Sequence, residues 1–535
     1  MFRMQTPHFW RVCCVSTAIT LLKSIFIALT PVRVLGMVPW IIDDAFIEMR
    51  VARNIALGLG FTYDGFHPTT GSPFLWTYLT ALNHFLPSLD AAVKATIIEC
   101  AIFGGFAAVT VYAIAWAATG RSMVGWVAFW LATLTGNAFF SGMNGMETTF
   151  FSFFLILTIA TYIGVGRPKH WGNMQWGMVV GLCGGIATLT RADGIFVLFA
   201  ISCVEALDIL RRARRQERQT HLQYLSGILI TGSICFVTLL LWNMISTGSW
   251  QPANQVGRRE LALALHNFSF ENFSFPHYLH IVVWNTIKLE ELITIAIGAS
   301  LLGLIALVHG AFGTLDAVLK RFTTVLAIYS GTFFVMLIAY QWYFPDFHGL
   351  RYINASALLI FVLVASLLVS LSFRTLRKTF VCVLTMAIIG ISWVDFRTLS
   401  YTMPWAPVMS FSASPTPEQV TKFWKPLDWL RDNLPEGTVV GVRDHGRFAV
   451  FTGKPVQDIA GNIDPIVVQH LKQGSLPQFL QERNVTHLFI PSLEQRNDTI
   501  YQALWQLPLE RVEAAPPDRM SQLYRIAWEK WQEAQ

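Results

Sequence analysis

Charged residues are scarce in this sequence. Only 13% of its 535 residues are Asp, Glu, Lys or Arg, whereas a soluble globular domain carries about 25%. Hydrophobic residues make up 53% of the chain, and the mean hydropathy is positive. This composition excludes an ordinary soluble enzyme and predicts an α-helical polytopic membrane protein. The net charge of +6 does not indicate nucleic-acid binding, because the basic residues lie in short segments between apolar runs.

Cysteine pairs and nucleotide-binding motifs are missing as well. The seven cysteines are scattered without C-x-x-C spacing, so neither a zinc site nor a disulfide framework is predicted. The sequence has no G-x-x-x-x-G-K-[ST] motif and no strand–G-x-G-x-x-G–helix unit, which argues against ATP-driven transport and dinucleotide chemistry. No internal repeat and no cleavable signal peptide is evident, so the first apolar stretch is expected to remain as a membrane anchor.

Long apolar runs, by contrast, are abundant. A membrane-spanning helix needs about 20 predominantly apolar residues. On this criterion we predict eleven spans, at 15–40, 92–118, 122–140, 149–166, 173–190, 194–210, 222–244, 291–310, 322–341, 352–372 and 379–396. Lys and Arg in the short loops then gather on one side, as expected of the cytoplasmic side. This topology places residues 41–91 and everything after about 397 outside a bacterial cytoplasmic (inner) membrane.

The last part of the chain has a different character. The stretch "VTKFWKPLDWLRDNLP" predicts an amphipathic helix that ends at Pro435. "GTVVGV" and "THLFIP" have the composition of short strands, and helical stretches are expected near 465–483 and 493–506. We therefore divide the chain into a transmembrane domain, 1–397, with its outer loop at 41–91, and an extracytoplasmic α/β domain, 398–535.

Unusual polar residues gather at the predicted outer ends of the spans. Asp43 and Asp44 follow the first span in "WIIDDAFIEMR". The others are Glu147 in "NGMETT", Arg191 and Asp193 in "LTRADG", Asn254 in "WQPANQVGRR", and Asp346, His348 and Arg351 around the tenth span. Because ionisable groups near spans tend to face a protein interior or a water-filled cavity, we predict a shared outer cavity.

Each of these residues also has a purely structural interpretation. The acid pair could be a helix-end stop signal, Glu147 a helix cap, Arg191 and Asp193 a local ion pair, and Arg351 an interfacial residue. The segment "AFIEMRVARNIALGLG" after the acids has helical periodicity that suits a helix in the membrane interface plane. Its apolar face would hold Phe46, Ile47, Val51 and Ile55, and its polar face Glu48, Arg50, Arg53 and Asn54.

The outer polar residues suit transfer of a sugar from a lipid phosphate. An arginine can bind a phosphate through two hydrogen bonds, and an aspartate can take the proton of an attacking hydroxyl. A sugar linked through phosphate to a polyprenol has a good leaving group, so a general base is the more useful catalyst. Nucleotide sugars are not available outside the cytoplasmic membrane, which favours a lipid-linked donor there.

The segment "DDAFIEMRVARNIALGLGFTYDG" resembles the signature of the GT-C class of membrane glycosyltransferases. Further matching segments follow in the order seen in one branch, that of the terminal β-(1→2)-arabinofuranosyltransferases and mannosyltransferase-like bacterial proteins. They are "GSPFLWTYLTAL", "NGMETTFFSFFL", "LTRADG", "STGSWQPANQVGR", "FHGLRYI" and "VVGVRDHGRFAVFTGKPVQDIAGNIDP". The resemblance covers nearly the whole chain.

This resemblance implies a polyprenyl-phosphate sugar as donor, carrying arabinofuranose, mannose or a similar sugar, and a cell-envelope glycan, lipid or protein as acceptor. It makes Asp43 or Asp44 the general base. The implied substrate-binding residues are Glu147, Arg191, Asp193, Asn254, Arg258, His348 and Arg351, with Arg191 and Arg351 as candidates for the donor phosphate. Arg258 stands where relatives commonly have a lysine, and His445 and Arg447 add charge to a segment that is usually less charged.

The main rival is a transporter or flippase of a lipid-linked glycan, which would share a lipid groove and buried charges. Transporters usually place ionisable sites near the midplane on repeated, interrupted helices, whereas here the charges lie at one face and no repeat is visible. A non-catalytic scaffold would leave the acid pair unexplained. The expected partners are the donor, the acceptor and membrane lipids, with the protein as a monomer. The sequence specifies no cofactor with certainty, and a divalent cation remains an open option.

Overall fold

The computed structural model describes residues 6–38, 41, 43–211, 214–257, 317–341, 355, 358–366, 382–383, 385–389, 416–443, 446–461, 463–491, 499–516 and 521–534. Its contacts divide the chain into two compact units. Unit 1 comprises Met1–Leu29, Lys94–Leu239 and Pro276–Ser410. Unit 2 comprises Thr30–Val93, Leu240–Phe275 and Phe411–Gln535. Each unit is built from segments that are far apart in the sequence.

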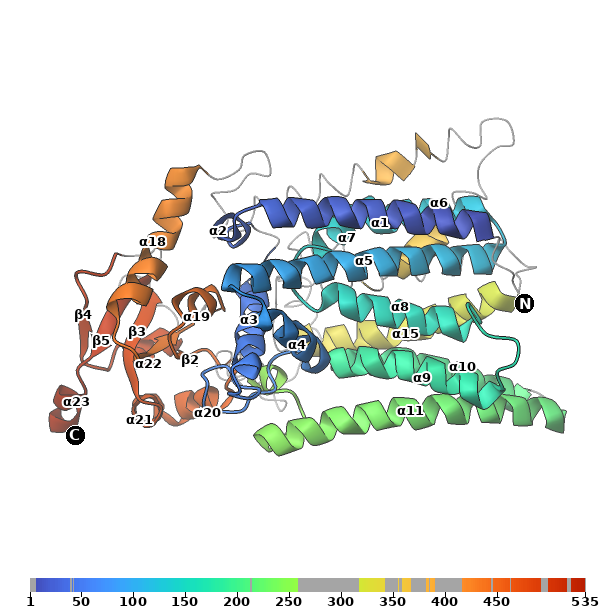
Figure 1. The fold of residues 1–535 in the computed structure, drawn as a ribbon. Coiled ribbons are helices and arrows are strands. Elements are labelled where there is room, and N and C mark those ends of the chain that lie inside the picture. Colours follow the sequence, from blue (N-terminus) through green and yellow to red (C-terminus); the bar gives the residue numbers. More distant parts are fainter. Residues whose placement is uncertain are drawn as a thin grey trace, which may run out of the picture. The chain divides into compact units, whose positions relative to one another are not determined.

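Unit 1 is helical, and its helices run side by side (Figure 1). They are α1 (Thr6–Leu29), α5 (Leu89–Thr119), α6 (Ser122–Leu134), α7 (Gly136–Ser141), α8 (Thr148–Tyr162), α9 (Asn173–Thr190), η2 (Ala192–Gly194), α10 (Ile195–Arg211), α11 (Arg215–Thr247) and α15 (Ala317–Gln341). The first residues of α5 and the last of α11 belong to unit 2. Apolar side chains from most of these helices form one continuous core.

Small residues let α9 and α11 approach closely. A Cβ atom on Gly177 would lie 2.2 Å from the carbonyl oxygen of Tyr224, and one on Gly181 would lie 2.4 Å from that of Ile228. The two glycines are four residues apart and so lie on one face of α9. This is the small-xxx-small packing typical of membrane helices, where close van der Waals contact replaces the hydrophobic effect as the main attraction.

Helices lie at the spans predicted at 92–118, 149–166, 173–190, 194–210, 222–244 and 322–341. The span predicted at 122–140 is wrong as a single helix, because extended backbone at Thr135 divides it into α6 and α7. Within the described residues, three helices are long and apolar enough to cross a membrane, His8–Leu29, Leu89–Thr119 and Arg215–Thr247, and Ser122–Leu134 and Thr148–Tyr162 are shorter apolar helices. Helix α9 has the bounds predicted for the fifth span. The span at 291–310 and most of those at 352–372 and 379–396 lie outside the described residues, so the count of eleven stays a prediction.

The prediction for the first span, 15–40, was wrong at both ends. Helix α1 runs from Thr6 to Leu29, and a separate short helix, α2 (Val32–Leu35), follows Pro31. The proline ring disfavours helical geometry in the residue before it, which explains why the helix stops there. The acid pair therefore does not end the first span but begins another helix, α3 (Asp43–Ala56).

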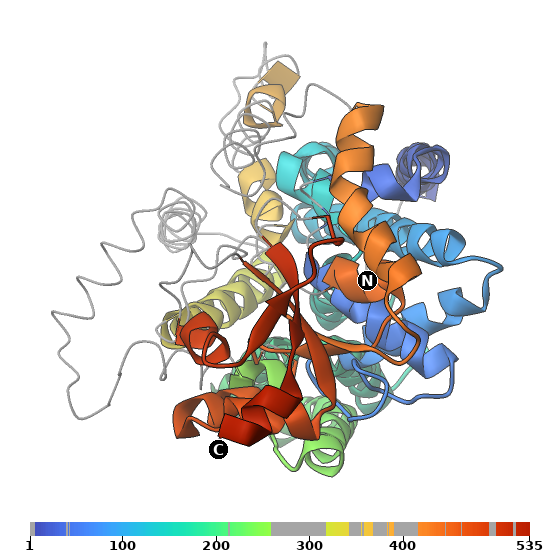
Figure 2. The same ribbon diagram turned by 90° about the vertical axis from the view of Figure 1, so that its left-hand side faces the viewer.

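Unit 2 contains a mixed sheet built, among the described residues, from β1 (Val439–Val442), β2 (Val456–Asp458), β3 (Val485–Pro491), β4 (Leu509–Arg511) and β5 (Ser521–Ile526). Their order is β2-β1-β3-β5-β4, with β1 parallel to β2 and β3, and β5 antiparallel to β3 and β4. The red strands stand side by side in Figure 2. Strands predicted from "GTVVGV" and "THLFIP" are confirmed as β1 and β3.

Helices precede, connect and follow these strands along the chain. They are α18 (Pro417–Asn433), α19 (Gly446–Thr452), α20 (Ile466–Gln473), α21 (Leu476–Glu482), α22 (Thr499–Leu504) and α23 (Trp528–Ala534). The predicted amphipathic helix is α18. A capping box between Thr416 and Gln419 starts it, and Leu434, extended before Pro435, ends it.

The segment predicted as an outer loop shares the core of this α/β fold. It contributes α3, α4 (Phe74–Ala81) and η1 (Leu82–Phe85) to unit 2. Val51, Phe61 and Tyr63 pack in one cluster with Val440 and Phe448. Residues 30–93 and the C-terminal segment are therefore two parts of one folded unit. The predicted boundary at 397/398 lies outside the described residues.

The polar face of α3 is not exposed as an interfacial helix would require. Glu48, Arg50 and Asn54 are all buried. The Arg50 guanidinium donates to the carbonyl of Ala449 in α19 at 3.3 Å, and the Asn54 amide donates to the carbonyl of Thr62 at 2.9 Å. The reason is tertiary: α19 and α4 both pack against α3, so its polar face meets backbone carbonyls rather than water.

A half-buried histidine gives unit 2 an expected acid sensitivity. Burial, helped by the charge of Arg53, lowers the pKa of His84 in η1 to about 4. Because this value lies below the ordinary 6.5, the unfolded chain takes up the proton first, so stability is lost as pH falls from 6.5 towards 4. We predict that His84→Gln flattens the decline of the thermal-unfolding midpoint across this window in detergent. Alkaline pH serves as the reference, and an unchanged slope contradicts the prediction.

Candidate functional site

The two acids of the predicted catalytic pair are adjacent at the start of one helix in unit 2. Both begin α3, where the positive end of the helix dipole favours carboxylates. The Asp43 carboxylate accepts hydrogen bonds from the backbone N–H groups of Gly446 at 2.6 Å and Arg447 at 2.9 Å, the first residues of α19. Asp44 is half-buried and lies one residue further along α3. Asp43 is thus committed to holding α19 in place.

Arg447 completes the surroundings of Asp43. Its Nη1 lies 3.5 Å from the Asp43 carboxylate. Its Nε donates to the carbonyl of Gly36 at 2.6 Å, and its Nη2 donates to the carbonyl of Ile41 at 2.7 Å. The guanidinium also lies 5.3 Å from the ring centroid of Phe46. One side chain of the C-terminal segment therefore contacts the chain before, at and after the start of α3.

A buried tyrosine lies beside the acid segment. Burial, together with the negative charges of Asp43 and Asp458, raises the pKa of the Tyr63 phenol far above its ordinary value. A phenol that stays neutral cannot accept a proton at physiological pH. The proton acceptor available in this segment is therefore a carboxylate.

Asn254 lies in a second polar region of unit 2. The backbone N–H of the preceding Ala253 donates to the hydroxyl of Thr70 at 2.9 Å. The amide oxygen of Asn254 is buried and accepts no hydrogen bond from any described residue. A buried acceptor without a donor costs about 1–3 kcal/mol. This oxygen is therefore a suitable acceptor for a ligand hydroxyl.

Glu147, Arg191 and Asp193 form an ion cluster in unit 1. The Arg191 guanidinium donates to Asp193 through Nε at 3.1 Å and Nη2 at 3.0 Å, and to Glu147 through Nη1 at 2.8 Å. The three side chains are only 4–10% exposed. Glu147 precedes α8 but makes no capping hydrogen bond to it. The guanidinium is thus already engaged by two carboxylates, the local ion pair that the sequence allowed as an alternative for Arg191 and Asp193.

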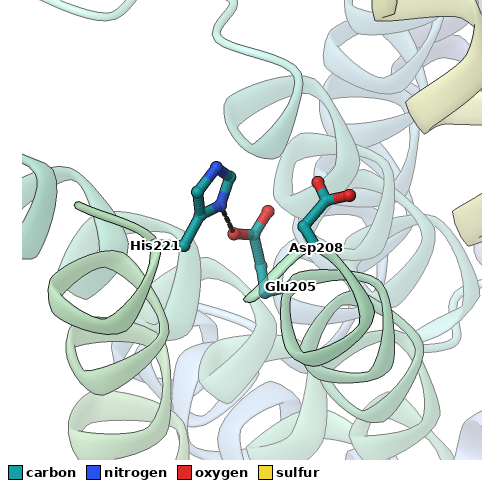
Figure 3. Close-up of side chains that lie close together, drawn as sticks. All are labelled: Glu205, Asp208 and His221. Carbon is teal, nitrogen blue, oxygen red and sulfur yellow. Dashed lines mark hydrogen bonds and ion pairs between the residues drawn. The ribbon is translucent and has the colours of Figure 1, made fainter. Parts of the chain in front are cut away.

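Glu205, Asp208 and His221 are the described residues whose side chains could hold a divalent cation (Figure 3). The Glu205 carboxylate already accepts from the Tyr162 hydroxyl at 2.8 Å and pairs with His221 Nδ1 at 2.6 Å. Arg321 lies 3.2 Å from Asp208. The carboxylate and imidazole groups that could bind a cation therefore already have protein partners. Together they form a polar network that joins α8, α10, α11 and α15.

This network is remote from the Arg191 cluster along α10. Asp193 precedes the helix and Glu205 follows twelve residues later, which at 1.5 Å per residue is roughly 18 Å. A cation there would not reach chemistry at the opposite end of the helix. Sequence reasoning missed this network, although a glutamate and an aspartate three residues apart in an apolar run were a usable signal.

The predicted site residues are thus distributed over both units. Asp43, Asp44 and Asn254 lie in unit 2, whereas Glu147, Arg191 and Asp193 bond to one another in unit 1. Arg258, His348 and Arg351 lie outside the described residues. The predicted shared cavity therefore stays a prediction.

Comparison with known proteins identifies the fold. A family model described as a domain of unknown function (DUF8728) matches residues 416–533. No curated protein matches the sequence. The chain is similar to the Archaeoglobus fulgidus oligosaccharyltransferase in the apo form, with a TM-score of 0.55 and 11% identity, covering 90% of this chain and 69% of that one. It is also similar to ArnT from Cupriavidus metallidurans in the apo state, with a TM-score of 0.50 and 12% identity, covering 90% and 93%.

At these identities the likeness concerns the fold alone. The chain shares the fold of the oligosaccharyltransferase and of ArnT. The fold does not show whether the chain belongs to the arabinofuranosyl- or mannosyltransferase branch that the sequence resembles.

Proposed function

We propose that the protein is a membrane glycosyltransferase that moves a sugar from a polyprenyl-phosphate donor to a cell-envelope glycan, lipid or protein acceptor. The reaction would take place on the extracytoplasmic face of a bacterial inner membrane. The observation that carries the proposal is the acid segment at the start of α3, in which Asp43 is held by α19 and Asp44 follows it. The GT-C fold supports the same class of reaction.

In this proposal Asp44 is the general base. It takes the proton of the acceptor hydroxyl as the oxygen forms a bond to the anomeric carbon of the sugar. The bond from that carbon to the phosphate oxygen breaks, and its electron pair leaves with the polyprenyl phosphate. The Asn254 amide oxygen would accept a substrate hydroxyl, because no described residue occupies it.

The cations for the lipid phosphate are proposed to be Arg351 and Arg258, both predicted to be outside the membrane. Arg191 is a weaker candidate than the sequence suggested, because two carboxylates already neutralise its guanidinium. Arabinofuranose and mannose are the first sugars to test, since the sequence resembles enzymes that transfer them. Glu147 and Asp193 would then have a structural role, which is to hold Arg191 within unit 1.

A donor screen tests the proposal directly. Purified protein in proteoliposomes is offered several polyprenyl-phosphate sugars, each with a radiolabelled sugar, together with extracted cell-envelope acceptors. Transfer from one donor that is absent in the Asp44→Asn variant supports the proposed reaction. Movement of intact donor across the bilayer without transfer would instead support the flippase.

A further inference from the structure

We propose that Arg447, from the C-terminal α/β segment, is a positioning residue that sets the place of the Asp43–Asp44 acid segment. The proposal rests on the proposed function, because it assigns Arg447 a role through the general base. Arg447 does not replace Asp44 as the proton acceptor. Its task is to fix the backbone from which Asp44 extends.

The contacts of Arg447 are arranged around the start of α3. Its side chain donates hydrogen bonds to the backbone carbonyls of Gly36 and Ile41, which precede the acids. The same guanidinium faces the Asp43 carboxylate and the ring of Phe46, and the Arg447 N–H donates to Asp43. An arginine is suited to this because its planar fork can hold several acceptors at fixed angles.

Gly446, the residue before Arg447, lies so close to Asp43 that there is no room for a side chain at this position. A Cβ atom on Gly446 would lie 2.1 Å from the backbone oxygen of Asp43 and 2.9 Å from its Oδ2. No side chain fits there without moving Asp43 or α19. Gly446 and Arg447 together therefore hold Asp43 from its backbone and its carboxylate at once.

A second arginine, Arg33, also links the segment 30–93 to the C-terminal segment. Arg33 in the same unit makes a bidentate ion pair with Asp428 of α18, with both distances at 2.8 Å, and it is about half exposed. Arg33 thus joins the same two parts of the chain as Arg447 does, but it does not contact the acids. This makes Arg33→Met a matched control for loss of an arginine that links these segments.

The consequence for catalysis follows from chain geometry. Asp43 and Asp44 are consecutive in the first turn of α3, so a shift of Asp43 carries the Asp44 carboxylate with it. A displacement of about 1 Å at a reacting group can cost about 10²-fold in rate. Substrate binding by groups elsewhere would be less affected.

The test compares Arg447→Met, Gly446→Ala and Arg33→Met in the full-length protein. We expect Arg447→Met and Gly446→Ala to lower kcat for sugar transfer about 10²-fold, with the KM for the donor within about twofold of wild type. Arg447→Lys should recover part of kcat, because an ammonium can still reach one carbonyl. Arg33→Met should keep kcat within about twofold of wild type and lower the thermal-unfolding midpoint only slightly, because an ion pair between half-exposed side chains contributes little stability.

Hydrogen exchange provides a readout that does not depend on activity. Backbone amides of residues 41–46 should exchange faster in Arg447→Met and Gly446→Ala than in wild type or Arg33→Met. Unchanged exchange there, or equal kcat for Arg447→Met and Arg33→Met, overturns the inference. If the wild-type protein accepts no donor, the proposed function fails, and the exchange comparison alone still decides whether Arg447 anchors the acids.

Discussion

Asp44→Asn is expected to insert and fold like the wild-type protein and to lose sugar transfer by at least about 10²-fold, the usual contribution of a general base. The amide keeps the shape of the side chain but cannot take up the proton of the acceptor hydroxyl. Because Asp43 is bonded to α19, it is not placed to substitute for Asp44. The measurement is kcat in proteoliposomes with the donor identified by the screen.

The neighbouring acid provides the matched control. Asp43→Ala removes the acceptor for two backbone N–H groups of α19, which should cost about 1–3 kcal/mol of unfolding free energy. Thermal unfolding in detergent should therefore show Asp43→Ala destabilised relative to the wild-type protein. Full activity of Asp44→Asn would remove the assigned base, and full activity of both variants would remove the assigned chemistry.

Arg191→Met is expected to destabilise the protein by about 3–5 kcal/mol, because it leaves the buried carboxylates of Glu147 and Asp193 without their cation. The loss should appear as a lower thermal-unfolding midpoint and a lower yield of folded protein. The remaining folded fraction should keep its KM for the donor, since the guanidinium is engaged within the protein rather than offered to phosphate.

Two further variants sharpen this prediction. Arg167→Met removes another arginine of unit 1, but its partners are the neutral Asn173 side chain and the Trp171 carbonyl, so a smaller loss is expected. The double variant Glu147→Gln/Arg191→Met should recover part of the stability, because one uncompensated charge is gone. A stable Arg191→Met protein with a much higher donor KM would instead support the phosphate-binding role that the sequence suggested.

Much of the secondary structure could be predicted because its causes are local. The apolar run of α9 and the β-branched run of β1 carry their own periodicity and composition, and both were found near their observed bounds. The end of α1 was missed because a continuous apolar stretch hides the effect of one proline. The polar face of α3 was misread because helical periodicity shows two faces but not what covers each one.

The candidate site was found only in part for a related reason. Asp43 and Asp44 stand out in the sequence as adjacent acids after an apolar run. Arg447 gave a weaker signal, which was only an additional charge in a segment expected to be less charged. Two of its partners are backbone carbonyls, which any residue can supply, so no partner residue type marks the contact in the sequence. The partners of Glu205 were hidden as well, since they come from three other helices.

The sequence by itself determined that this is a membrane protein with an acid pair suited to proton transfer, because hydropathy and carboxylate chemistry belong to the residues themselves. Only the tertiary structure decided that the Asp43 carboxylate holds the start of α19, and that residues 30–93 share a core with the C-terminal sheet. The physical reason is distance along the chain. Asp43 and Gly446 are 403 residues apart, so no local pattern of the sequence reveals their contact.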